Sequence, residues 1–130
     1  MSTTPFALLD LAKEIAAGGQ ESHLRSAVSR AYYAGYHGCK EWYESLPGVA
    51  SISGQEGGVP QQLINQLQNP APEVKCQETR MLSKKLSTRL QVFRVQRVKA
   101  DYFLDEAKPF DMWSANAIAG VELMLAQMQQ

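Results

Sequence analysis

The chain has 130 residues, of which 45% are hydrophobic and 20% charged, and its 13 basic residues balance 13 acidic ones. This length suits one domain with a single core, and this composition excludes intrinsic disorder. No apolar run reaches the ~18 residues of a membrane span and no leader pattern opens the chain, so we expect a cytoplasmic protein without membrane association.

The first predicted helix follows Thr4 and Pro5, because threonine suits the N-cap and proline the first helical position. Apolar residues then recur at helical spacing until the glycine pair 18–19 ends the pattern. A second helix is expected over about 21–44, with Pro47–Gly48 ending it. Two long helices therefore open the chain.

Residues 46–59 are rich in glycine and serine, which predicts a flexible loop. Pro60 then opens a short helix that Asn69–Pro70 closes, because a residue before proline is pushed out of the helical region. A long helix is expected after Pro72. Its apolar stripe contains one arginine and comprises Leu82, Leu86, Leu90, Phe93, Arg97, Ala100 and Leu104.

Lys108–Pro109 breaks the chain again, and Asp111 or Ser114 is expected to cap a last helix. One side of this helix carries Trp113, Ala117, Val121, Met124 and Met128. We therefore predict an all-α fold, an antiparallel bundle of four main helices and a short one, forming a single domain over residues 1–130.

The two cysteines, Cys39 and Cys76, belong to no disulfide or zinc motif, so neither a metal nor a cofactor is expected.

Charge is unevenly distributed along the chain. Between positions 75 and 99, eight basic residues face one acidic residue, which gives this segment a net charge of +7. These basic residues are Lys75, Arg80, Lys84, Lys85, Arg89, Arg94, Arg97 and Lys99. A basic strip of this kind can bind a phosphate backbone, with Lys84 and Lys85 positioning RNA. The alternative is an ordinary solvated face, or one that meets acidic helices.

Three polar side chains of the second helix are predicted to share one face. Arg30 and His37 are seven residues apart, a rotation about 20° short of two turns, and Tyr33 lies between them. His23, seven residues before Arg30, extends the same ridge.

A guanidinium that binds a phosphate oxygen and an imidazole that transfers a proton suit phosphodiester cleavage without a metal. In RNA the adjacent 2′-hydroxyl is the nucleophile. The alternative is a buried hydrogen-bond network between helices, in which these side chains serve stability alone.

Two segments of the chain resemble the paired signatures of HEPN domains. They are Ser29–His37, which reads SRAYYAGYH, and Arg97–Tyr102, which reads RVKADY. The resemblance implies a HEPN-like helical bundle that forms a homodimer. It also implies that Arg30 and His37 are the catalytic residues of a metal-independent endoribonuclease at the dimer cleft. By the same resemblance, Arg97 and Asp101 form a structural ion pair that holds the long helix against the second helix.

HEPN domains of this size occur as toxins of toxin–antitoxin or phage-defence pairs, so the resemblance implies RNA as substrate and a nucleotidyltransferase-type antitoxin as partner. Others are non-catalytic accessory modules that bind a nucleotidyltransferase or a nucleotide. Many toxin members carry a tyrosine three residues after the histidine, where this chain has Lys40. This difference and the neutral net charge favour the accessory function, so both functions remain open.

Overall fold

A computed structural model describes residues 3–48 and 59–129. It contains five helices: α1 (Pro5–Ala16), α2 (Glu21–Glu44), α3 (Val59–Gln68), α4 (Gln77–Tyr102) and α5 (Phe110–Met128). No strand occurs in these two ranges. The prediction of an all-α bundle with four main helices and a short one is therefore confirmed. The predicted loop at 46–59 falls mainly on residues 49–58, which lie outside the described part of the chain.

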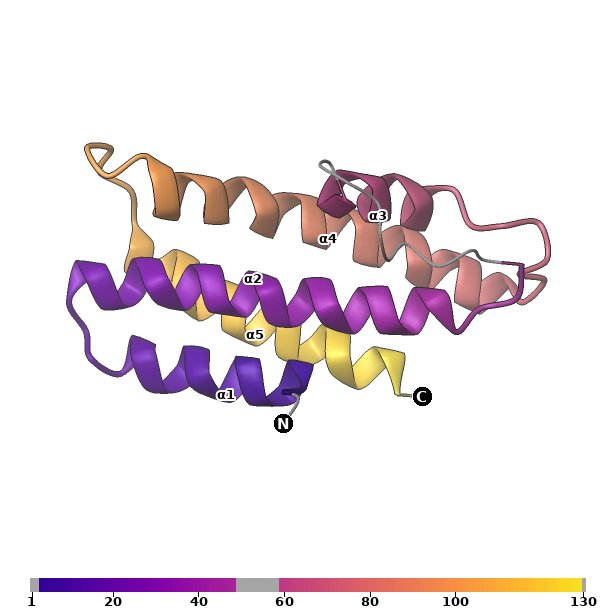
Figure 1. Ribbon diagram of the computed structural model, residues 1–130, viewed down its shortest axis with the longest axis horizontal. Helices are drawn as coiled ribbons and strands as arrows, with labels where there is room; N and C mark the ends of the chain where they lie inside the picture. Colours follow the sequence, from indigo (N-terminus) through magenta and orange to yellow (C-terminus); the bar gives the residue numbers. More distant parts are fainter. Residues whose placement is uncertain (1–2, 49–58, 130) are drawn as a thin grey trace.

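The four long helices lie side by side, and α3 packs on the outer side of α4 (Figure 1). Helix α2 is central, since it contacts α1, α4 and α5. Consecutive long helices run in opposite directions (Figure 1). The largest fully buried side chains include Tyr32, Leu63, Leu67, Leu86, Leu90 and Met124. The core therefore draws on α2, α3, α4 and α5 together.

Two glycines allow α2 and α5 to approach each other closely. A Cβ atom at Gly38 would lie 2.5 Å from Cδ2 of Leu125, and one at Gly35 would lie 3.1 Å from Cγ2 of Val121. Such distances are shorter than van der Waals contact, so larger residues would displace α5. This close packing fixes which face of α2 points away from the core.

Local signals set the ends of the first helices as predicted. The Thr4 Oγ1 atom accepts a hydrogen bond from the Ala7 N–H at 3.1 Å, and Pro5 occupies the first helical position. After α1, Gly19 adopts a φ of 77°, a left-handed conformation that glycine tolerates best. The chain then reverses into α2, which begins at Glu21 as expected.

Helix α3 is attached to α4 by two buried serines. The Ser83 hydroxyl donates to the Leu67 carbonyl at 2.6 Å, and the Ser87 hydroxyl donates to the Ile64 carbonyl at 2.8 Å. Carbonyls in the last turn of a helix lack partners within that helix. The Leu67 carbonyl is one of these, so Ser83 satisfies the buried end of α3, and Ser87 adds a second bond to α3 nearly one turn earlier.

Two predicted details, one of α4 and one of α5, are wrong. Helix α4 ends at Tyr102, and Leu104 is 70% exposed, because Phe103 leaves the helical region before the stripe reaches that leucine. Helix α5 begins at Phe110, before both predicted capping residues, and no side chain caps it. Ser114 instead donates its hydroxyl to the Asp111 carbonyl at 3.0 Å.

The C-terminal end of α4 is capped by Arg25, a residue of α2 whose side chain is only 8% exposed. Its guanidinium donates to the carbonyl oxygens of Ala100, Phe103, Leu104 and Glu106 at 2.9–3.2 Å. The Nε–H donates to the Glu21 carboxylate at 3.0 Å, and the Phe110 ring lies 4.2 Å from Cζ. Arg25 therefore joins α2, α4 and the connection to α5.

Candidate functional site

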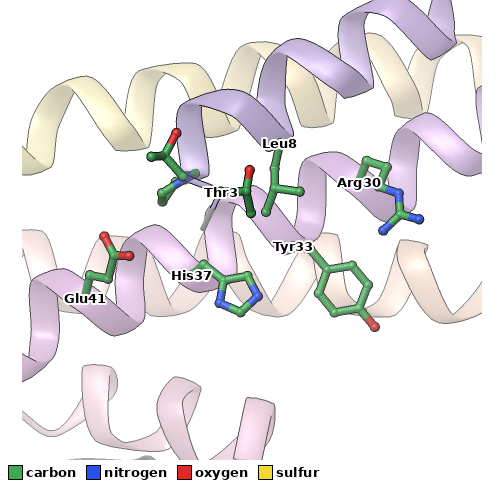
Figure 2. A pocket seen from close by; sticks show the side chains of 8 residues that line it. Thr3, Leu8, Arg30, Tyr33, His37 and Glu41 are labelled. Atoms are coloured by element: carbon green, nitrogen blue, oxygen red, sulfur yellow. The ribbon is translucent and has the colours of Figure 1, made fainter. Parts of the chain in front are cut away.

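Arg30, Tyr33 and His37 line one surface pocket of about 550 Å3. They project in succession from one face of α2, opposite the start of α1 (Figure 2). The full lining comprises Thr3, Thr4, Pro5, Leu8, Arg30, Tyr33, His37 and Glu41. The helical spacing in the sequence thus corresponds to a real juxtaposition in the fold.

Arg30 is exposed, and its guanidinium makes no hydrogen bond or ion pair with any residue that the structure describes. This contrasts with Arg25, five residues earlier on the same helix, whose donors are all engaged. A guanidinium with five unused donors binds phosphate or carboxylate oxygens in a bidentate geometry. The pocket therefore presents a cation that is available to an anionic ligand.

Tyr33 is held in place from α4. The Arg97 Nη2 atom donates to the Tyr33 hydroxyl at 2.5 Å, and Arg97 Cζ lies 5.1 Å from the centre of the tyrosine ring. Arg97 Nε pairs with the Asp101 carboxylate at 3.1 Å, and that carboxylate accepts a hydrogen bond from the Ser29 hydroxyl, also at 3.1 Å. This network connects the back of the pocket to α4 through two residues of α2.

His37 is exposed at the pocket wall, with the Tyr36 ring edge-on at 5.1 Å between centroids and the Tyr33 ring at 6.5 Å. Partial burial lowers the pKa of His37 below its usual value. Glu41 opposes this shift, and Lys40 adds to it. The imidazole therefore reaches its charged form at a more acidic pH than a solvated histidine does.

Neither Arg30 nor His37 is buried. The alternative of a purely structural network between helices therefore fits only Tyr33, which does bond to α4. Arg30 and His37 face solvent at the pocket, where a ligand can reach them.

His23 does not extend the ridge, so that part of the prediction is wrong. Its Nδ1 atom accepts a hydrogen bond from the Gln20 N–H at 3.3 Å at the start of α2. The ring also lies against Gly18, where an added Cβ would be 2.5 Å from Nδ1. His23 therefore caps the helix and stabilises the turn after α1.

The basic strip does not form one open face. Arg80 donates to backbone carbonyls of the connection before α4, Arg94 donates to Gln61, and Lys99 pairs with Glu106. Lys84 and Lys85 are exposed on α4 and do not line the Arg30 pocket. Their function in positioning RNA remains a prediction.

The residue most clearly missed from the sequence is Glu41, which lines the pocket one turn after His37. Its spacing of four residues was a sufficient signal, because such residues are neighbours on a helix surface. Thr3 and Thr4 also line the pocket, but they come from the start of α1. No local pattern relates them to α2.

In the described ranges, no three or more His, Cys, Asp or Glu side chains are grouped so that they could bind a metal ion. None of the helices in these ranges combines the length and apolar character that crossing a membrane requires. Comparisons with protein-family models, with curated proteins and with solved structures each find no match for this chain.

Proposed function

We propose that this protein is a metal-independent endoribonuclease of a toxin–antitoxin or phage-defence system. The observation that carries the proposal is the pocket in which the guanidinium of Arg30, unpaired among the described residues, and the exposed imidazole of His37 lie on one face of α2. Both groups are accessible to an RNA strand, and neither forms a hydrogen bond or ion pair with another described residue.

In the proposed reaction, Arg30 binds the nonbridging oxygens of the scissile phosphate and stabilises the charge that develops on them. The 2′-hydroxyl attacks phosphorus, the bond to the 5′-oxygen breaks, and His37 takes part in the proton transfers. Tyr33, fixed by Arg97, forms the wall between them and positions the substrate. The products carry a 2′,3′-cyclic phosphate and a 5′-hydroxyl.

The proposal includes the HEPN-like arrangement, a cytoplasmic homodimer in which the Arg30 pockets of two copies face one cleft. What supports it is the openness of the pocket, since Arg30 and His37 are both exposed in the single chain. A second copy on this side would enclose an RNA strand. A nucleotidyltransferase would be the antitoxin of such a pair.

One observation favours a non-catalytic accessory module instead. At the position of the tyrosine that many toxin members carry, Lys40 forms an ion pair with Glu44 at 3.3 Å. The Arg30 pocket would then bind a nucleotide phosphate or contribute to docking of a nucleotidyltransferase. Such a module requires Arg30 for binding but does not require His37 for proton transfer.

The test is incubation of the purified protein with mixed cellular RNA in the presence of a chelator. Cleavage with 2′,3′-cyclic phosphate ends is expected from the wild type. His37→Ala should lower the rate by about 10²–10⁴-fold, the usual contribution of general acid–base catalysis. The matched control is His23→Ala, which changes the other histidine outside the pocket and should leave the rate per folded molecule unchanged. A folded wild type that cuts no RNA would refute the ribonuclease and favour the accessory module.

A further inference from the structure

The pocket lining includes a carboxylate, that of Glu41, which has no role in the reaction described above. Glu41 lies one turn beyond His37, and both side chains are on the face of α2 that borders the cavity (Figure 2). Glu41 is exposed and forms no hydrogen bond or ion pair with the described residues. Residues four apart on a helix have Cβ atoms about 5–6 Å from each other, so the two groups can contact one phosphodiester.

Cleavage by the 2′-hydroxyl requires two proton transfers. A base removes the hydroxyl proton as the oxygen attacks phosphorus, and an acid protonates the departing 5′-oxygen. A single imidazole has to do both in turn, whereas two separate groups can act in one step. A site with Arg30, His37 and Glu41 therefore contains a phosphate-binding cation and two groups able to transfer protons.

We propose that Glu41 is the general base of this site and His37 its general acid, an inference that rests on the proposed ribonuclease function. The Glu41 carboxylate takes the proton of the 2′-hydroxyl while the 2′-oxygen bonds to phosphorus. The bond from phosphorus to the 5′-oxygen breaks, and His37 in its imidazolium form gives the Nε2–H or Nδ1–H proton to that oxygen and becomes neutral. Water then returns one proton to the imidazole and removes one from the carboxyl, so atoms and charge balance.

Among the described residues that line the pocket, Glu41 carries the only carboxylate and is therefore the base candidate. On α2, the imidazole is faced by Tyr33, Tyr36, Lys40 and Glu41, with Arg30 further along the same face. The opposite wall is formed by the start of α1 and the two residues before it, which carry no ionisable side chain: Thr3, Thr4, Pro5 and Leu8. Lys40 and Arg30 are cations and donate protons or bind anions.

The experiment compares ordinary RNA with an oligonucleotide whose scissile 5′-oxygen is replaced by sulfur. A thiolate leaves without protonation, so this substrate no longer needs the acid but still needs the base. The proteins are the wild type, Glu41→Gln, His37→Ala and Glu14→Gln. Glu14 is an exposed glutamate of α1 that does not line the pocket and is therefore the matched control.

On ordinary RNA, both Glu41→Gln and His37→Ala are expected to lose about 10²–10⁴-fold in rate, and Glu14→Gln should keep the wild-type rate. On the sulfur substrate, His37→Ala should regain most of its rate while Glu41→Gln stays slow. Melting temperatures of all variants should match the wild type, because both pocket residues are exposed.

Three results would overturn the inference while leaving the ribonuclease intact. They are a Glu41→Gln variant with the wild-type rate on ordinary RNA, rescue of Glu41→Gln rather than His37→Ala by sulfur, and rescue of neither. The second would make His37 the base. Failure of the wild type to cleave either substrate is a separate outcome, which refutes the proposed function itself and the inference with it.

Discussion

Arg25 and Arg30 lie on the same helix, five residues apart, but the structure assigns them opposite roles. Arg25 is buried and caps the end of α4, whereas Arg30 is exposed and has no partner in the described residues. We therefore expect Arg25→Met to destabilise the fold strongly and Arg30→Met to leave stability nearly unchanged. Methionine keeps most of the aliphatic stem in both variants, so the comparison isolates the guanidinium.

The magnitude follows from what Arg25→Met removes. Four backbone carbonyls lose a charged donor, and a hydrogen bond to a charged group contributes about 1.5–3 kcal/mol. The losses do not add fully, since some carbonyls regain water and the cost of burying the guanidinium disappears. We expect a loss of about 3 kcal/mol in the free energy of unfolding, which lowers Tm by roughly 10 °C for a domain of this size.

Urea denaturation followed by circular dichroism measures both variants against the wild type, with an unchanged m-value as the check on two-state unfolding. Arg30→Met should remain within about 0.5 kcal/mol of the wild type, as exposed substitutions do. Arg25→Lys keeps the charge but not the planar fork of donors, so its free energy of unfolding should lie between those of Arg25→Met and the wild type. A loss below about 1 kcal/mol in Arg25→Met, or one equal to that of Arg30→Met, would refute the capping role.

Three further outcomes are expected. Partial burial disfavours the protonated imidazole of His37, so its pKa is lower in the folded chain than the ~6.5 of the unfolded chain. The folded state is therefore stabilised above pH ~6.5, and this stabilisation declines as the pH falls towards the lowered pKa. The slope of Tm against pH between 7 and 5 should therefore be smaller in His37→Gln, and equal slopes would contradict the shift. Ser83→Ala and Ser87→Ala should each cost about 1 kcal/mol in urea denaturation, since a hydrogen bond to α3 is lost, with RNA cleavage unchanged. Lys84→Glu with Lys85→Glu should weaken RNA binding and flatten its dependence on salt concentration in fluorescence anisotropy, and an unchanged salt slope would exclude these lysines from the interface.

Signals within a few residues determined most of the helix boundaries. Thr4 and Pro5 start α1, the following glycines end it, and the pairs 69–70 and 108–109 separate the later helices. These signals act through φ, ψ and hydrogen bonds inside one turn, so the sequence is sufficient to read them. The shared face of Arg30 and His37 was equally predictable, because helix geometry alone sets it.

Only the tertiary structure decided which charged side chains are buried. Five residues separate Arg25 from Arg30, a rotation of about 140° on a helix, so one points into the bundle and the other into the pocket. The sequence does not show that Arg25 is buried, since the backbone carbonyls that accept from it are more than 70 positions away. The pocket likewise needs Thr4 of α1 to form its opposite wall. Contacts at such sequence separation depend on how the helices pack, because no local dihedral preference brings these residues together.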